Sequence, residues 1–494
     1  MSHVAVEAVA DALNAANYTH RGVSEVLGDA GMRALTRGEF VGPERATRGG
    51  SPLETLIRLF LLGETVSLIQ ARDAIPFSQA WQLGLMEPVG AIGGDVRATL
   101  DLRPYSVDSH DWWVVSDLGA EQRSVPLKAD HVLGIGGAST TLAQLAPRLP
   151  VGTSLDLGTG CGVQGLHLST HSTSVMATDI NPRAIRLAEL TFALNAITVE
   201  LEQGDLLLPV AGRTFDQIVS NPPFVVGSGA GGYTYRDSGL AGDTLSRRLV
   251  AELPNHLNPN GTAQMLGNWM HVRGEDWRER IAGWAIGNRC DVWIAQRDVQ
   301  DPAEYVGLWL NDAAEDRGGD LRRRYDDWLA WFDEHEVEGI GFGFVLMKRT
   351  DSDDPAVVVD EITQPIHPPL GQSVTDWFTR QATLRDLSDD QVLATAWRLA
   401  EDVSLEQIAQ RAPDGGWAVL GQVLRQESGV RWREDVDQMV ATLLVGCDGN
   451  HRMRELLSVL ETAYPLESGV DRDVLYDATA VAVRHLVTRG FLTT

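Results

Sequence analysis

Four polar segments, each following an apolar run of strand length, stand in the middle of this 494-residue chain. They are the glycine-rich turn Leu155–Gly162, the acids Asp179 and Asp205, and the run Asn221–Phe224. Strand-like and helix-like segments alternate from residue 153 to residue 345, which predicts a doubly wound parallel sheet. Ligands of such sheets bind outside the carboxyl ends of the strands, so the four segments are expected to line one site.

The glycine-rich turn lies where the first strand passes into a helix. Gly158, Gly160 and Gly162 permit positive φ angles and a close approach of the backbone to a ligand. Asp156, at the end of the strand, is expected to orient the turn. On its own this pattern fits a nucleotide site or a structural turn equally well.

The run Asn221-Pro222-Pro223-Phe224 suits a reaction at a planar nitrogen. Such a nitrogen, in an amide or an aromatic amine, is a poor nucleophile because its lone pair is delocalised. The side-chain oxygen of Asn221 and the carbonyl of Pro222 can each accept one N–H, which aligns the nitrogen and stabilises its developing positive charge. Pro223 stiffens the turn, and Phe224 offers a face on which a planar group can stack.

Together these segments resemble the class I S-adenosylmethionine-dependent methyltransferases, over roughly residues 130–350. Within that class they resemble the planar-nitrogen branch, which includes release-factor glutamine methyltransferases and ribosomal RNA adenine- and guanine-amino methyltransferases. The resemblance implies an α/β fold with a seven-stranded Rossmann-like sheet and S-adenosylmethionine as the cofactor. It also implies that Asp179 accepts both ribose hydroxyls. Asp205 would accept the adenine amino group, with the Leu206 backbone nearby and Ile180 packed on the ring.

The methionine portion of the cofactor would lie across the glycine-rich turn. The residues implied there are Asp156, Gly158, Thr159, Gly160, Gly162 and Asn221. The loop 134–140, with Gly137 and Ser139, would close over the cofactor carboxylate. Structural alternatives remain for these residues: Asp179 as the cap of a helix near Pro182, Asp205 as a turn acid, and loop 134–140 as a helix cap.

Three further residues are candidates for contact with the substrate. Tyr233 and Arg236 lie in a glycine-rich segment after the Asn221 motif and are expected to form a lid. An ion pair of Arg236 with Asp237 or with Asp243 is the structural alternative for this segment. Trp269, at the end of the fifth strand, either walls the pocket or packs in the core.

Composition changes along the chain predict three domains. Residues 1–105 are mostly helical with a wing-like hairpin, and residues 106–350 form the catalytic domain with a helical insertion at 302–337. Residues 351–494 form an acidic, helical, winged-helix-like domain. Ser404–Ala409 and Arg452–Leu457 are two similar segments within it and are expected in short helices. Winged helices often bind nucleic acid, but because this domain is acidic, docking of a protein partner or dimerisation is expected at least as readily.

The formal net charge is −27, so any surface that grips nucleic acid must be a confined patch. No run of 18 apolar residues exists, so no membrane association is expected. The three cysteines show no metal-binding or disulfide spacing, which favours a reducing cytoplasm.

The sequence therefore predicts N-methylation of a macromolecule of the translation machinery. The acidity of the chain tilts the prediction slightly toward a protein glutamine amide, with the exocyclic amine of adenine or guanine in RNA as the alternative. The alternative from a different functional class is a scaffold or regulatory subunit that binds the cofactor without catalysis.

Overall fold

The computed structural model describes residues 2–90, 94–122, 127–229, 234, 237–312, 321–413, 415–463 and 472–494. The chain divides into two compact units. The first comprises residues 1–143, 149–353 and 357–360, and the second residues 144–148, 354–356 and 361–494. Within the described ranges, no helix is both long enough and apolar enough to cross a lipid bilayer.

The N-terminal helices and the large sheet belong to one unit. The N-terminal elements are α1 (His3–Ala15), α2 (His20–Thr36), α3 (Val41–Ala46), α4 (Pro52–Leu56), η1 (Ile57–Leu61), β1 (Val66–Ser67), α5 (Leu68–Ala74), α6 (Phe77–Gln82), β2 (Met86–Val89), β3 (Asp95–Ala98), β4 (Asp101–Val107) and β5 (His110–Ser116). Val9 and Leu13 of α1 share a hydrophobic core with Leu187 of helix α9 (Pro182–Leu194). The hairpin β4–β5 crosses the boundary expected at residue 105, and its Trp113 N–H donates to Asn195 Oδ1 at 2.9 Å. The N-terminal segment is therefore packed onto the catalytic fold.

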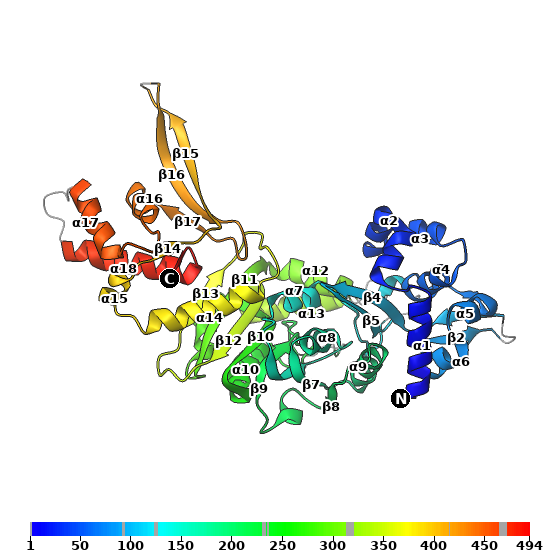
Figure 1. Ribbon diagram of the computed structural model, residues 1–494. Helices are drawn as coiled ribbons and strands as arrows, with labels where there is room; N and C mark the ends of the chain where they lie inside the picture. The colour runs from blue at the N-terminus through cyan, green and yellow to red at the C-terminus, as the bar shows by residue number, and fades with distance from the viewer. Residues whose placement is uncertain are drawn as a thin grey trace. The chain divides into compact units, whose positions relative to one another are not determined.

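The large sheet has eight strands in the order β13-β11-β12-β10-β9-β6-β7-β8 (Figure 1). Its strands are β6 (Val151–Leu157), β7 (Ser172–Asp179), β8 (Glu200–Gln203), β9 (Phe215–Ser220), β10 (Leu257–Val272), β11 (Cys290–Gln300), β12 (Val337–Arg349) and β13 (Val357–Glu361). Strands β10, β9, β6, β7 and β8 run parallel, whereas β12 pairs antiparallel with both β10 and β11. The seven expected strands are all present, and most are longer than expected.

The eighth strand, β13, corrects the expected end of the catalytic fold at residue 350. Asp360 on β13 accepts a hydrogen bond from Trp293 Nε1 at 2.9 Å, and Asp360 is itself only 8 % exposed. Short polar segments such as 351–356 read as linkers, but here the chain returns to the sheet before leaving it.

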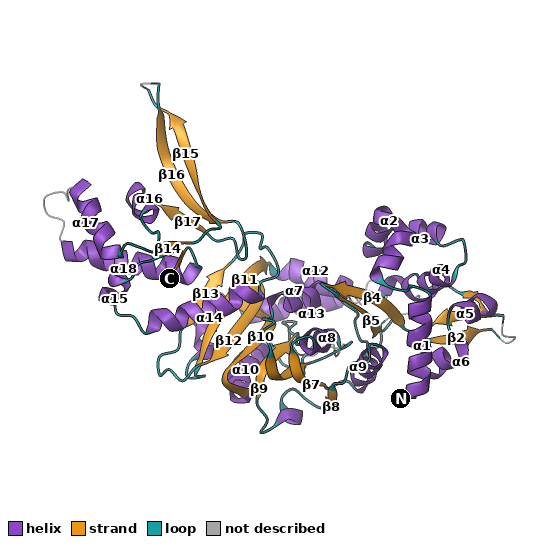
Figure 2. Ribbon diagram, in the orientation of Figure 1, coloured by secondary structure: helices purple, strands orange, loops and turns teal. Residues whose placement is uncertain are grey.

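Helices connect the strands and flank the sheet (Figure 2). They are α7 (Gly137–Leu145), α8 (Val163–Ser169), α9, α10 (Thr244–Glu252), α11 (Trp277–Ala282), α12 (Pro302–Asp312) and α13 (Leu321–Glu334), with short 3₁₀ turns η2 (Ala120–Gln122), η3 (Leu208–Val210), η4 (Leu253–His256) and η5 (Gly283–Ala285). The pair α12 and α13 forms the helical insertion that the sequence predicts between the sixth and seventh strands. Asn181 caps α9 by accepting from Arg183 N at 2.9 Å, with Pro182 at the first helical position.

The second unit combines helices with a three-stranded sheet. It contains α14 (Gly371–Arg385), α15 (Asp389–Ala394), β14 (Arg398–Leu399), β15 (Val403–Arg411), β16 (Trp417–Gln426), β17 (Arg433–Val436), α16 (Gln438–Val445), α17 (Met453–Ala463), α18 (Arg472–Arg489) and β18 (Leu492–Thr493). Residues 404–409, expected in a short helix, lie instead in strand β15, which pairs antiparallel with β16 in a hairpin. The hairpin projects from the helices of this unit (Figure 1) and carries exposed Ile408, Trp417 and Leu420.

Candidate functional site

A cavity of about 520 Å³ lies at the carboxyl ends of β6, β7, β8 and β9. Most of the residues singled out in the sequence line it: Ser139, Gly158, Thr159, Gly160, Asp179, Ile180, Asp205, Leu206, Asn221, Pro222 and Pro223. Parallel strands thus bring all four polar segments to one site, as a doubly wound sheet requires.

The glycine-rich turn presents bare backbone to this cavity. Gly158 and Gly160 have φ angles of 79° and 55°, which disfavour other residues. A Cβ at Gly160 would meet nothing within 4 Å, so glycine is needed here for the positive φ and not because a neighbouring atom leaves no room. The absence of a Cβ also keeps the cavity open above the backbone. Gly162 differs, because it does not line the cavity and a Cβ there would stand 3.1 Å from the Phe192 ring. Gly162 therefore permits α8 to pack closely against α9.

Asp156 holds the turn from below the cavity. Its side chain is fully buried, and Oδ2 accepts from Thr159 Oγ1 at 2.6 Å and from Gly165 N at 2.9 Å. Burial raises the pKa of Asp156 to about 7. The second oxygen, Oδ1, is buried with no hydrogen-bond partner. Because Asp156 itself does not line the cavity, its visible role is to orient the turn.

Asp179 faces the cavity from the end of β7. Its Oδ2 accepts from Gly160 N and its Oδ1 from Asn181 N, both at 2.9 Å. Burial raises the pKa of this carboxyl despite these hydrogen bonds. The cap position of α9 belongs to Asn181, so the alternative of Asp179 as the helix cap does not describe this structure.

One side of the cavity is lined by Asp205, Leu206 and Ile180. Asp205 is exposed, and Leu206 has a positive φ of 46°, which turns the backbone at the end of β8. Ile180 leaves 52 % of its surface exposed and lines the cavity with an apolar side chain. These three residues could hold a flat aromatic ring with a polar edge.

The loop 134–140 closes part of the cavity. Gly134, Gly136 and Ser139 line it, and the Ser139 carbonyl accepts from Gln164 Nε2 at 2.7 Å. Gly137 is the first residue of α7 and is not a lining residue.

The Asn221 motif leaves β9 directly at the cavity. Ser220 Oγ donates to Leu157 O at 2.8 Å, which fixes the end of β9 to β6. Asn221 Oδ1 is buried and has no hydrogen-bond partner. A buried carbonyl without a donor costs about 1–3 kcal/mol, and a ligand in the adjoining cavity is one source of that donor. Phe224 lies outside the cavity lining, edge-on to Trp309 with ring centroids 6.2 Å apart.

The remaining substrate candidates fall elsewhere. Trp269 is fully buried in the core below the sheet edge, where its Nε1 donates to Gln296 Oε1 at 2.8 Å. Of the two roles expected for Trp269, the structure shows core packing and not a wall of the cavity. Tyr233 and Arg236 lie outside the described residues. Asp243 binds Arg280 through both carboxylate oxygens, at 2.7 and 2.8 Å.

Sequence reasoning missed His131 and Arg248, which also line the cavity. His131 is only 3 % exposed and stands 3.4 Å from Asp117, which also binds Arg183. The Asp130-His131 pair just ahead of loop 134–140 was the only available signal. Arg248 gave none, since an arginine on a helix after a loop is an ordinary surface residue.

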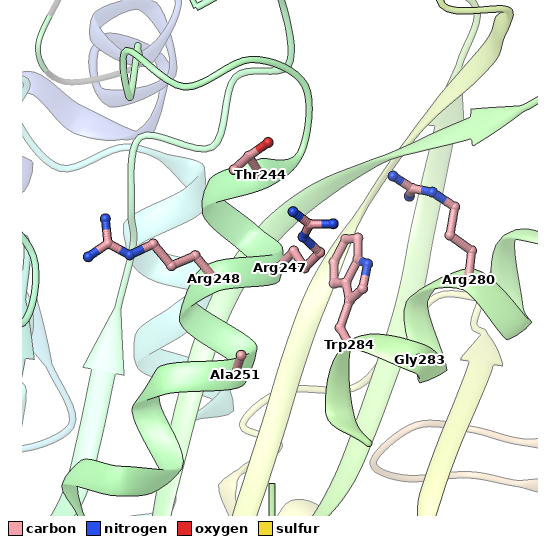
Figure 3. Close-up of a pocket in the computed structure, with 7 residues that line it drawn as sticks. All are labelled: Thr244, Arg247, Arg248, Ala251, Arg280, Gly283 and Trp284. Carbon is pink, nitrogen blue, oxygen red and sulfur yellow. The ribbon is translucent and has the colours of Figure 1, made fainter. Parts of the chain in front are cut away.

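A second cavity, of about 720 Å³, lies beside α10 (Figure 3). Its lining residues are Thr244, Arg247, Arg248, Ala251, Arg280, Gly283 and Trp284. Arg248 lines both cavities, so the two are neighbours. Arg280 is held by Asp243, and Arg248 pairs with Glu252 at 2.9 Å. Arg247 is exposed and has no ion-pair partner in the part of the chain that the structure describes.

Comparison with known proteins identifies the domain around the first cavity. Residues 134–272 match the methyltransferase small domain family. Two further families, each described as a domain of unknown function, match residues 15–99 and 375–494. The first unit thus contains an S-adenosylmethionine-dependent methyltransferase domain with a Rossmann-like α/β fold.

Curated relatives are similar over the same region. Ribosomal RNA small subunit methyltransferase C of Alcanivorax borkumensis is 31 % identical over 117 residues, which are 24 % of this chain and 32 % of that protein. The protein of the same name from Idiomarina loihiensis is 33 % identical over 134 residues, 27 % of this chain and 36 % of that protein. The chain therefore spans about a third of the length of these relatives. A solved T. thermophilus 16S rRNA N2 methyltransferase, in complex with AdoMet and guanosine, is 16 % identical with a TM-score of 0.28, covering 50 % of this chain and 63 % of that one.

The cavity fits S-adenosylmethionine, the cofactor of this domain class. The residues that line it offer a glycine turn for the methionine portion and a carboxylate at Asp179 for the ribose. Ile180 and Asp205 line the part of the cavity available to the adenine. Placing each group of the cofactor on these residues is a prediction from the resemblance.

Proposed function

We propose that this chain transfers a methyl group from S-adenosylmethionine to the exocyclic amino group of a purine base in RNA. The observation that carries the proposal is the buried, unpartnered Oδ1 of Asn221 at the cavity. An exocyclic amine has two N–H groups, and Asn221 Oδ1 is the acceptor proposed for one of them. The carbonyl of Pro222 is the acceptor proposed for the other.

When bound, S-adenosylmethionine supplies an electrophilic methyl group on sulfur. The chain's own residues hold the amine in line with that methyl group and stabilise the positive charge that builds on nitrogen as the new N–C bond forms. Transfer of the methyl group would leave the bonding electron pair on sulfur, and the methylated nitrogen would lose one proton to solvent. No general base is required, because an alkylated aromatic amine is strongly acidic while it carries the positive charge.

Two observations favour an RNA base over a glutamine amide. The relatives reported above carry the name of a ribosomal RNA methyltransferase. The cavity beside α10 adds a local set of arginines next to the site, in a chain whose net charge is −27. Arg247, exposed and without an ion-pair partner among the described residues, is suited to a phosphate. The glutamine amide, toward which the acidity of the chain tilted the prediction from sequence, is therefore the weaker candidate.

The test is transfer of labelled methyl groups from S-adenosylmethionine into a cell extract by the full chain. Label that disappears after nuclease and survives protease supports the RNA base, and the modified nucleoside then identifies the amine. Label that survives nuclease and disappears after protease supports the glutamine amide. If no fraction is labelled although the cofactor binds, the domain acts as a scaffold.

The second unit is proposed to recruit a macromolecular partner in the cytoplasm. Its hairpin β15–β16 exposes Ile408, Trp417 and Leu420, a surface of apolar character that suits a protein better than a phosphate backbone. Replacing Trp417 with alanine should reduce labelling of the physiological target without changing cofactor affinity. Unchanged labelling of that target would remove this surface from the account.

A further inference from the structure

The backbone just after the Asn221 motif is held by side chains of the helical insertion. Val226 is fully buried, and its N–H donates to Tyr305 Oη of α12 at 2.8 Å. Its carbonyl accepts from Trp328 Nε1 of α13 at 3.1 Å. Both polar groups of one peptide segment, two residues beyond Phe224, are thus bound by helices that lie 79 and 102 residues further along the chain.

Tyr305 also ties this segment to the sheet. Its Oη accepts a second hydrogen bond, from Asn268 Nδ2 on β10, at 3.0 Å. The tyrosine is fully buried, with the rings of Phe342, Trp309, Phe332 and Trp328 at centroid distances of 5.5 to 6.2 Å. Trp309 in turn contacts Phe224. The insertion therefore reaches the motif through a hydrogen bond at Val226 and through a ring at Phe224.

The motif needs such external support for a physical reason. Pro222 and Pro223 have no N–H, so these two residues cannot be fixed by backbone donors of their own, and the first backbone pairing after them is the β-bridge between Phe224 and Asp237. Gly227, the next residue after Val226, accepts from Gly242 N at 2.8 Å, which closes the base of the loop but does not tie it to the sheet. Among the described contacts, the hydroxyl of Tyr305 makes that connection.

We propose that Tyr305 is a positioning residue for methyl transfer, and that the insertion α12–α13 fixes the Asn221 motif in the geometry that the reaction needs. This inference rests on the proposed function. Tyr305 does not line the cavity and does not touch the cofactor or the substrate. It acts by keeping the acceptors of Asn221 and Pro222 preorganised, so that no reorganisation is required when charge develops on nitrogen.

The first test is activity-independent. Tyr305→Phe removes only the hydroxyl and keeps the packed ring. Hydrogen exchange of the full chain should become faster in a peptide covering residues 221–229, while peptides from β6 and β7 remain unchanged. Tyr325→Phe is the matched control: it removes a hydroxyl bond inside the insertion, from Tyr325 Oη to Ala303 O at 2.9 Å, that does not reach the motif. Unchanged exchange at 221–229 in Tyr305→Phe overturns the positioning role.

The second test measures transfer. Tyr305→Phe should lower turnover about 10-fold or more, with the affinity for S-adenosylmethionine changed by less than about 2-fold. In an Asn221→Ala background the same substitution should cost clearly less turnover than it costs in the wild type, because the part of its effect that acts through Asn221 is already lost. A merely structural role predicts that the two losses add, and that result overturns the inference.

The two proposals fail in different ways. If the wild-type chain labels RNA and Asn221→Ala does not, the proposed function holds, and a fully active Tyr305→Phe rejects only the positioning role. If neither RNA nor protein is labelled by the wild-type chain, the proposed function is rejected and the positioning role falls with it, whatever the exchange experiment shows.

Discussion

The two halves of the site are held together in different ways. The cofactor half depends on partners close in the sequence: Asp156 binds Gly165, nine residues away, and Asp179 binds Gly160, 19 residues away. The half that holds the Asn221 motif depends on Tyr305 and Trp328, which are 79 and 102 residues from Val226. Cofactor binding and transfer geometry therefore have separate supports, and substitutions should affect them separately.

The largest expected effect is on the cofactor half. Asp179→Ala should remove the two charge-assisted hydrogen bonds proposed for the ribose, each of about 1.5–3 kcal/mol, and should weaken S-adenosylmethionine binding by about one to three orders of magnitude. Titration calorimetry on the full chain measures this. Glu202→Ala, an exposed acid on β8 that does not line the cavity, is the matched control and should bind like the wild type. Unchanged affinity in a folded Asp179→Ala variant contradicts the ribose assignment.

Asp156 should make the stability of the cofactor half depend on pH. Burial raises the pKa of its carboxyl to about 7, whereas an unfolded aspartate titrates near about 4. Between these values the folded state binds the extra proton, so rising pH lowers the free energy of unfolding, by up to about 1.4 kcal/mol per pH unit. In Asp156→Asn this contribution disappears, and stability should fall less steeply from pH 4 to pH 7. Denaturant unfolding of both proteins across that range measures the difference, and equal slopes would contradict the raised pKa.

The smallest expected effect concerns RNA docking beside the motif. Arg247→Ala should reduce the salt dependence of RNA binding by the value of one phosphate contact, a change of about 0.7–0.9 in the slope of log affinity against log salt. Arg322→Ala, on the exposed face of α13, tests the basic cluster 322–324 as the alternative docking surface. If the slope changes in Arg322→Ala and not in Arg247→Ala, RNA docks on the insertion and not beside α10, which contradicts this prediction.

The sequence predicted the cofactor half well because its signals are local. A glycine that must have positive φ, and an acid at a strand end, leave patterns that can be read within 20 residues. Ile180 and Leu206, which the resemblance assigns to the adenine, both line the cavity. The eighth strand was missed, since β13 follows a polar segment and is recognised only by its pairing with β11.

Long-range contacts could not be predicted in the same way. Nothing in the order of residues connects Tyr305 with Val226, or tells whether Trp269 faces the cavity or the core. Strand β15 has the composition of a helix over residues 404–409, and only its pairing with β16 makes it a strand. Tertiary pairing decided these cases against local propensity.

The most direct measurement of the central claim is made on Asn221→Ala, with cofactor affinity and methyl transfer determined on the same preparation. The account predicts that S-adenosylmethionine binds this variant nearly as tightly as it binds the wild type, because the supports of the cofactor half are intact. It predicts that turnover, measured as transfer of labelled methyl groups to RNA, falls about 100-fold or more, which is the scale of one lost transition-state hydrogen bond. Full turnover in a variant that binds cofactor normally would contradict the claim that the buried oxygen of Asn221 holds the reacting nitrogen.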